Sequence, residues 1–164
     1  MRLKEPKDLC LYELSAMYNG EKTIVEMLKE VARDIDNDTL AEMMRTHQRE
    51  TQEQAEILEG CFRHLGAEPQ DVPCGVVDAI RTEYKDFTAQ KPSSQVLTMF
   101  ALGGALKTEH FEIATYRGLI DKAMAMGDNE LANSLTTILK QEEETASKLE
   151  HFAHELDTKV LQSA

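Results

Sequence analysis

Four stretches of this chain each carry a glutamate near the middle of a mostly apolar stripe whose members recur at steps of three and four. Such steps place residues on one face of an α-helix, so each stripe is predicted to face the interior of a helical bundle. The four glutamates are Glu21, Glu50, Glu109 and Glu142. Because converging buried carboxylates are costly without a cation, metal binding is the leading hypothesis for function.

The second stripe differs from the other three in having several polar members. It reads Leu40, Met43, His47, Glu50, Gln54, Ile57 and Cys61. Its three polar residues are consecutive and central, whereas each of the other stripes has one charged residue near mid-length. This stretch is therefore the richest in potential ligands.

Signals for helix ends divide the chain between the stripes. Pro6 suits a first helical turn, Asp38 is a candidate N-cap, and Gly66 and Gly127 can end helices. The predicted helices span roughly 7–34, 38–65, 95–126 and 129–159, with ends uncertain by about 2–4 residues. Residues 67–94 form a long connection, in which an apolar periodicity predicts a short helix between Gly75 and Gln90.

This order of elements predicts an all-α fold of one domain over residues 1–164. Short turns make antiparallel hairpins of the first and second pairs of helices, and the long connection must cross between the hairpins. That topology is the ferritin-like form of the four-helix bundle. In each hairpin the two glutamates lie at one level, so all four are expected to meet in the centre.

Particular segments resemble the YciE/YciF stress proteins of the ferritin-like superfamily. They are Leu14 to Lys22, His47 to Gln54, Glu109 to Tyr116 and Glu142 to Glu144. The similarity spans nearly the whole chain and keeps the order and spacing of the four helices. It implies a bacterial cytoplasmic bundle, a dimer, and a rubrerythrin-like di-iron site.

The candidate ligands depart from the Glu-x-x-His pattern of ferritin-like di-iron proteins. Glu53 and Thr145 stand where the two histidines would be, while His47 precedes Glu50 by one turn and Glu112 follows Glu109 by one turn. The predicted ligand set is Glu21, His47, Glu50, Glu109, Glu112 and Glu142. His47 has the alternative of a core histidine bonded to Glu50 or Gln54, and Glu112 that of a solvated flank residue.

A site rich in carboxylates with at most one imidazole favours iron or manganese over structural zinc. Two iron ions per chain are predicted, with manganese as the alternative, about 3.5–4 Å apart so that both can contact one O2 or peroxide. Tyr18 and Tyr116 are candidate hydrogen-bond donors to the ligands, although both residues also suit a simple core or boundary position.

Composition excludes several classes of partner. The formal net charge of −12 and the absence of a basic patch argue against nucleic acid and anionic membranes. No run of about 18 apolar residues is present, and the N-terminus lacks the apolar core of a signal peptide, so a cytoplasmic location is expected. Cys10, Cys61 and Cys74 form no Cys-x-x-Cys pair, so the chain would need an external electron donor.

Three functional classes remain from the sequence. The first is a di-iron protein that reduces peroxide or dioxygen, the second an iron-binding or storage protein, and the third a structural or interaction bundle linked to stress. The first is preferred because no feature of a storage shell is visible. A homodimer is also predicted, because the long connection has more apolar residues than one bundle face would cover. These residues are Val76, Val77, Ile80, Tyr84 and Phe87.

Overall fold

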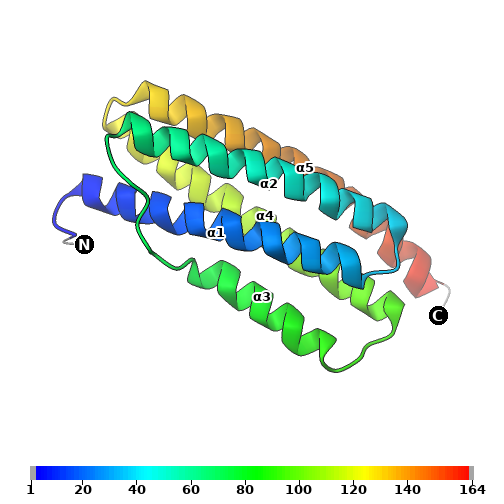
Figure 1. Ribbon diagram of the computed structural model, residues 1–164. Helices are drawn as coiled ribbons and strands as arrows, with labels where there is room; N and C mark the ends of the chain where they lie inside the picture. The colour runs from blue at the N-terminus through cyan, green and yellow to red at the C-terminus, as the bar shows by residue number, and fades with distance from the viewer. Residues whose placement is uncertain (1–2, 163–164) are drawn as a thin grey trace.

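The computed structural model describes residues 3–162, and the regular structure in that range is helical throughout. The helices are α1 (Pro6–Asp34), α2 (Asp38–His64), α3 (Gly75–Thr88), α4 (Ser94–Ala125) and α5 (Asn129–Gln162). As Figure 1 shows, α1 and α2 form one hairpin, α4 and α5 form the other, and α3 lies in the crossover. This is the predicted architecture, including the short helix between the hairpins.

Local signals fix most helix ends. Pro6 is the first residue of α1, where its missing N–H leaves no helical bond unmade. The side chain of Asn37 accepts a hydrogen bond from the backbone N–H of Leu40 at 2.9 Å, so Asn37 caps α2 and the predicted cap, Asp38, lies in the first turn. Asp128 caps α5 by accepting from a backbone N–H at 3.0 Å.

The two glycines predicted to end helices have left-handed backbone conformations. Gly66 has a φ of 61° and Gly127 a φ of 75°, values at which glycine avoids the steric cost that a Cβ would bring. Gly66 follows the last turn of α2 and Gly127 follows the last turn of α4, so the crossover and the α4–α5 turn begin where the sequence predicted. The largest difference in a boundary is at the end of α5, which was predicted at residue 159 and extends to Gln162.

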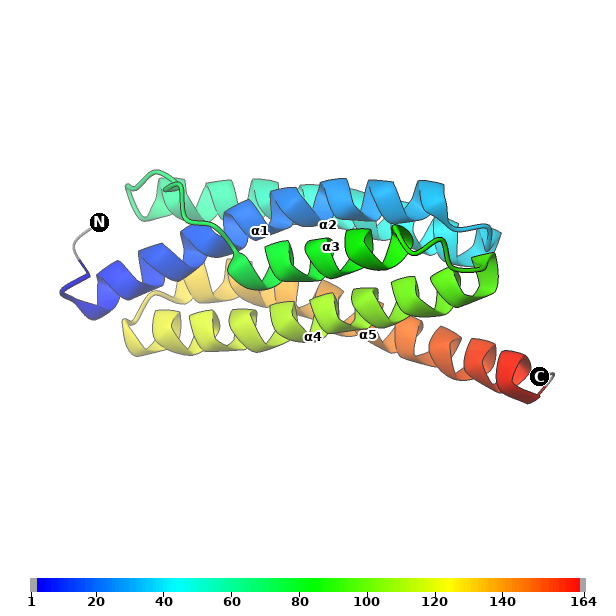
Figure 2. The ribbon, with the colours of Figure 1, turned by 90° about the horizontal axis from the view of Figure 1, so that it is seen from below.

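The crossover is hydrogen-bonded to α1 and packs against it next to the candidate ligand Glu21. The side-chain amide of Asn19 donates to the backbone carbonyls of Gln70 and Val72, both at 2.9 Å. A Cβ at Gly20 would lie 3.2 Å from both Cβ and Sγ of Cys74, so glycine lets the start of α3 pack closely on α1. Figure 2 shows α3 alongside α1 and α4.

The apolar face of α3 is mostly covered by its own bundle, which differs from the expectation behind the predicted dimer. Val77 and Tyr84 are buried, Ile80 packs against the core, and Phe87 stacks on Phe100 with ring centroids 3.7 Å apart. Val76 alone of the five crossover residues is exposed, at 47%. The uncovered apolar surface of the crossover is therefore limited mainly to Val76, and the homodimer itself stays a prediction.

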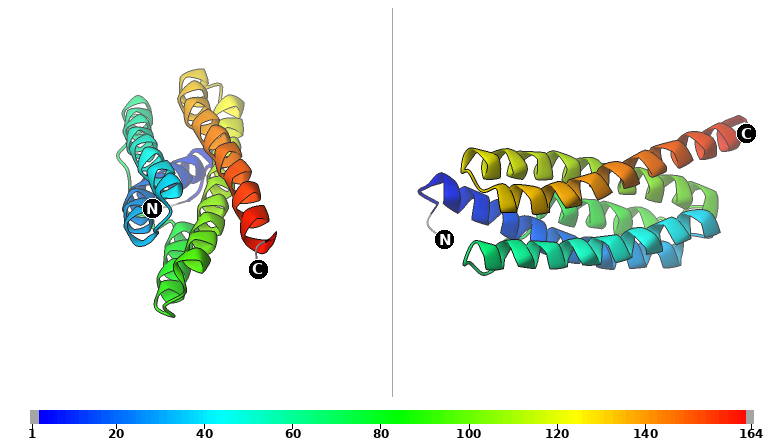
Figure 3. Two further views of the ribbon diagram at one scale, coloured as in Figure 1. Left: turned by 90° about the vertical axis from the view of Figure 1, so that its right-hand side faces the viewer. Right: turned by 90° about the horizontal axis from the view of Figure 1, so that it is seen from above.

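The bundle interior consists of two apolar clusters at different levels. One contains Leu14, Met17, Leu58 and Leu135, and the other contains Ile24, Leu28, Leu40 and Leu102, among further residues. On each of α1, α2, α4 and α5, a segment of buried polar residues separates the two clusters. The views in Figure 3 show these four helices running alongside one another, with the C-terminal part of α5 extending past its neighbours.

Within residues 3–162, none of the helices combines the length and the apolar character needed to cross a bilayer. The cysteines Cys10, Cys61 and Cys74 are all buried and unpaired as thiols. They lie in apolar surroundings, and burial is the largest cause of the raised pKa of each thiol. Such thiols are poor metal ligands and poor nucleophiles.

Candidate metal centre

The polar layer between the two apolar clusters contains most of the predicted ligands. Glu21 comes from α1, His47 from α2, Glu109 and Glu112 from α4, and Glu142 from α5. Each stands where the helical repeat would otherwise place an apolar core residue. The four carboxylates are 0% exposed and His47 is 2% exposed, so these side chains are almost completely buried.

Four of these side chains converge on one point. One potential ligand atom from each of His47, Glu109, Glu112 and Glu142 lies within 4.8 Å of the others. His47 Nδ1 and Glu109 Oε1 are 3.1 Å apart, yet neither makes a hydrogen bond. The alternative of a core histidine bonded to Glu50 or Gln54 therefore does not describe His47, whose nearest carboxylate is Glu109.

Buried ligand atoms without hydrogen-bond partners are concentrated in this layer. Within the part of the chain that is described, both oxygens of Glu109 and Glu112, both ring nitrogens of His47, and one oxygen each of Glu21 and Glu142 have none. Folded proteins normally pair buried polar atoms, and each unpaired one carries a desolvation cost. A cation bonded to these oxygens and nitrogens would satisfy them, so the donor set fits a metal ion.

Glu21, on α1, interacts with this group through two residues of α4. Tyr116, which is completely buried, donates its hydroxyl to Glu21 Oε1, as expected for one of the two candidate tyrosines. Glu21 also lies beside Glu112, and each affects the pKa of the other. The other tyrosine, Tyr18, donates instead to Glu59 at 2.8 Å, away from the carboxylate layer.

Gln54 is a further member of the layer, with a role that the stripe pattern did not assign. Its amide donates to Glu142 Oε1 and, at 3.2 Å, to Gln141. The remaining oxygen, Gln54 Oε1, is buried without a partner. Gln54 therefore fixes the orientation of Glu142 and favours its ionised form, since the amide donates to a carboxylate oxygen.

The carboxyl groups of the layer strongly perturb one another. Burial, and then repulsion by Glu142, raises the pKa of Glu21 to about 8 and that of Glu109 well above its ordinary value. The pKa of Glu112 is raised well above the ordinary value, first by burial and then by Glu142 and Glu21. Without a cation these shifts favour the protonated forms, so metal binding must displace protons.

The imidazole is shifted in the opposite sense for the same reason. Burial lowers the pKa of His47 to about 4, so the ring is neutral at physiological pH. A neutral imidazole has one nitrogen with a free lone pair, which is the form that coordinates a metal. His47 is thus in the state required of a ligand without any further deprotonation.

Glu50 does not lie in the buried layer. Its side chain is half-buried at the α2–α5 boundary, where Glu50 Oε2 accepts from the hydroxyl of Thr145 at 3.4 Å. The inward face of α2 contains Met44, Thr51 and Leu58, rather than the neighbouring Met43, Glu50 and Ile57 of the predicted stripe. Glu50 still influences the pKa of Glu109 and Glu142, so it borders the layer from the solvent side.

Glu112 lies deeper than the sequence indicated. The alternative of a solvated flank residue is wrong, because the side chain is fully buried among Glu21, Glu109 and Glu142. The reason is that α4 contacts α1, α3 and α5, so a broad arc of this helix is covered. Of the six predicted ligands, the structure brings five into one buried layer and leaves Glu50 at its edge.

Comparisons with known proteins agree with this description. A family model described as a domain of unknown function, DUF892, matches residues 5–162. Protein YciF of Escherichia coli K12 is 26% identical over 154 residues, which are 93% of each chain. The crystal structure of the E. coli stress protein YciF superposes with a TM-score of 0.91 at 25% identity, covering 96% of this chain and 99% of YciF.

Two other solved structures have the same fold. YcfI from Rhodopseudomonas palustris matches with a TM-score of 0.87 and 30% identity over 90% of this chain and 94% of that chain. Ferritin-like, diiron-carboxylate proteins from Bacillus anthracis match with a TM-score of 0.73 and 17% identity, covering 92% of this chain and 99% of that chain, and show the fold alone. The resemblance to YciF and the ferritin-like all-α fold class are thereby confirmed.

Proposed function

This chain belongs to the DUF892 family, and from that premise we propose that it is a di-iron protein of the stress response that reduces peroxide or dioxygen. The observation that carries the proposal is the buried layer in which His47, Glu109, Glu112 and Glu142 offer unpaired ligand atoms to a common point. The relationship to the stress protein YciF supports the physiological setting.

The proposed ligands are the six residues Glu21, His47, Glu50, Glu109, Glu112 and Glu142. Four of them can reach one ion, and Glu21 and Glu50 adjoin this group from opposite sides of the bundle. Hard oxygen donors with one imidazole suit iron, with manganese as the alternative. A bound pair of ferrous ions would supply two electrons to an oxygen–oxygen bond.

The side chains around the ligands have separate tasks in this proposal. The hydroxyl of Tyr116 holds Glu21 in one orientation, and the amide of Gln54 holds Glu142. The apolar clusters above and below the layer keep bulk water away. Burial and mutual repulsion raise the pKa of Glu109 and of Glu112, which favours their protonated forms, so a cation would displace protons from them on binding.

Electron supply must come from outside the chain. The three cysteines are buried and widely spaced along the sequence, and they offer no second metal centre for electron transfer. We therefore propose that an external electron donor supplies the two electrons for each turnover. The reaction with hydrogen peroxide consumes two electrons and two protons and yields two molecules of water.

The test is the oxidation of iron by peroxide. Metal-free protein loaded anaerobically with about two Fe(II) per chain is expected to oxidise this iron on addition of hydrogen peroxide faster than free Fe(II) in the same buffer. The Glu109→Ala variant should lose this acceleration because a fully buried ligand is gone. Stopped-flow absorbance would follow the Fe(III) product.

The matched control is Glu144→Ala, which removes an exposed carboxylate two residues from Glu142 on the same helix. It should oxidise iron as the unaltered protein does. If the unaltered protein and both variants oxidise iron no faster than the buffer, the proposed reaction is refuted.

A further inference from the structure

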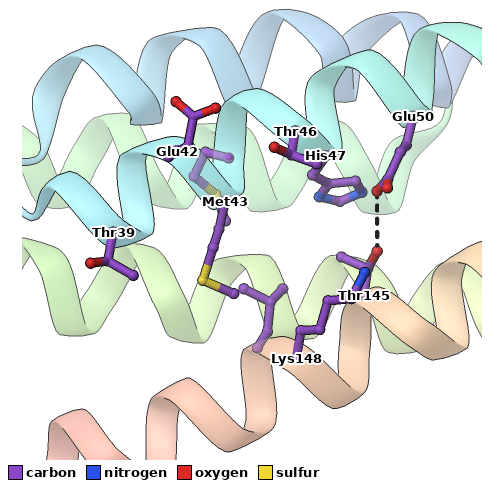
Figure 4. Close-up of a pocket in the computed structure, with 10 residues that line it drawn as sticks. Thr39, Glu42, Met43, Thr46, His47, Glu50, Thr145 and Lys148 are labelled. Carbon is purple, nitrogen blue, oxygen red and sulfur yellow. Dashed lines mark hydrogen bonds between the residues drawn. The ribbon is translucent and has the colours of Figure 1, made fainter.

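A pocket between α2 and α5 leads from the surface to the candidate metal centre. It has a volume of about 310 Å³, and its lining includes His47 of that centre together with Glu50 and Thr145. Figure 4 shows His47 and Glu50 extending from α2, with Thr145 and Lys148 on α5 across from them. Because His47 belongs to the buried layer while Glu50 is half-buried, the pocket connects that layer with solvent.

The pocket is much larger than hydrogen peroxide or dioxygen requires. A cavity of about 10–15 Å³ already accommodates one water molecule, whereas sites for small organic ligands begin near 300 Å³. A volume of about 310 Å³ falls at the beginning of that second range. Dioxygen or hydrogen peroxide would leave nearly all of the space unfilled, so the pocket has room for a substrate with a carbon skeleton.

The apolar side chains that line the pocket favour a ligand with an apolar carbon skeleton. Met43, Met44 and Leu149 are apolar residues of the lining, and Met44 and Leu149 also belong to the apolar core. Methionine side chains adapt to different apolar shapes and make favourable contacts with aromatic rings. An alkyl or aryl group bound here would be shielded from water by side chains of both α2 and α5.

The polar residues that line the pocket favour a small polar group without negative charge on the bound molecule. Thr145 presents a hydroxyl, and its bond to Glu50 is 3.4 Å long, at the weak limit, so that this hydroxyl is readily available to another acceptor. Glu42 and Glu50 are both at the pocket, and they disfavour an anionic head, whereas Lys148 is the cation that lines it. A neutral hydroperoxide group meets these requirements.

We propose that this pocket binds organic hydroperoxides, with the hydroperoxide group toward His47, Glu50 and Thr145 and the carbon skeleton against Met43, Met44 and Leu149. The inference rests on the proposed function and names its substrate class. In the reaction the O–O bond of ROOH breaks, two electrons and two protons are taken up, and an alcohol ROH and water form. The electrons come from the external donor already required.

The first test measures binding to the metal-free protein, so that it does not depend on metal loading. Full-length protein labelled with ¹³C at the methionine methyl groups is titrated with cumyl alcohol, the product of cumene hydroperoxide reduction. The methyl signals of Met43 and Met44 are expected to shift in a saturable manner. Those of Met124 and Met126, which are exposed near the end of α4, should stay in place.

Two variants and a matched control locate the binding site. Met43→Trp fills the pocket and should abolish the shift of Met44, while Met124→Trp makes the same replacement at a residue outside the pocket and should preserve it. Thr145→Val retains shape without the hydroxyl and should weaken binding. The inference is overturned if Met43 and Met44 do not respond, or if Met43→Trp leaves the Met44 shift intact.

The second test compares substrates in the iron-loaded protein. The ratio of the rate with cumene hydroperoxide to the rate with hydrogen peroxide should fall about tenfold in Met43→Trp, and remain unaltered in Met124→Trp. An equal ratio in all three proteins contradicts the inference even if iron is oxidised. Failure to bind iron would refute the proposed function instead, while the titration with cumyl alcohol would still decide the role of the pocket.

Discussion

Replacing Glu112 with glutamine is expected to stabilise the metal-free protein and to remove its ability to bind two metal ions. The side chain is fully buried, and burial together with Glu142 and Glu21 raises the pKa of this carboxyl well above its ordinary value. Glutamine has nearly the same shape and no charge to desolvate. At pH 8 the free energy of unfolding should therefore rise, because the folded protein no longer has to bury this ionisable group.

Thermal unfolding in the presence of a chelator measures this change. The melting temperature should increase, by about 2–4 °C for each kcal/mol gained in a domain of this size. Added Fe(II) or Mn(II) should raise the melting temperature of the unaltered protein and leave that of Glu112→Gln unchanged. Glu144→Gln, a surface replacement on α5, serves as the control and should resemble the unaltered protein in both respects. A destabilised Glu112→Gln that still binds metal would contradict the assignment of Glu112.

The free energy of unfolding of the metal-free protein is expected to fall as the pH rises from about 5 to 8. The folded pKa of Glu21 is about 8, above its unfolded value of 4.5, and the pKa values of Glu109 and Glu112 are raised in the same direction. In this range the folded state therefore holds protons that the unfolded state has lost. Each such carboxyl lowers stability by up to about 1.4 kcal/mol per pH unit.

His47 produces the opposite slope at lower pH. Its folded pKa is about 4, below the ordinary 6.5, so the unfolded state binds a proton that the buried ring does not. Stability should thus also fall as the pH drops from about 6.5 to 4, which opposes the carboxyl effect over that window. Urea unfolding at a series of pH values with chelator present would measure both slopes.

The metal-loaded protein is the control for this pH series. A bound cation keeps the carboxylates ionised in the folded state, so the decline in stability toward pH 8 should disappear. A metal-free protein whose stability rises steadily from pH 5 to 8 would show that the carboxyl groups of the layer are not buried as described.

The architecture was predictable because the apolar stripes and the residues that end helices indicate the same helices. The stripes through Glu21 and Glu142 are the buried faces of α1 and α5, and Gly66 and Gly127 mark where helices end. Capping was less certain where two suitable residues adjoin, as with Asn37 and Asp38. Either side chain can accept from the first turn, and only the backbone conformation decides between them.

The inward face of α2 was ambiguous for a geometric reason. A helical step from His47 to Gln54 can pass through Glu50 or through Thr51, since steps of three and four both remain near one face. The predicted stripe passes through Glu50, at the same alternating steps of three and four as in the other helices. The structure buries Thr51, whose hydroxyl donates to the backbone carbonyl of His47 at 2.9 Å, and leaves Glu50 half-buried.

The central position of Glu112 and the pocket at Thr145 could not be read from periodicity. Glu112 is buried because α4 packs against three neighbours, a property of the tertiary arrangement rather than of the sequence of that helix. The pocket requires α2 and α5 from different hairpins to approach with small and flexible side chains facing each other. Its residues lie about 100 positions apart in the sequence, as Glu50 and Thr145 show.

The buried layer is expected to bind metal ions, and the number of ions bound per chain can be measured. Protein stripped with chelator is equilibrated anaerobically by dialysis against Fe(II), and separately against Mn(II), and the metal is quantified. We expect about two ions per chain in the unaltered protein, with binding lost in Glu112→Gln and retained in Glu144→Gln. No binding above the dialysis buffer, or equal binding by the unaltered protein and Glu112→Gln, would contradict it.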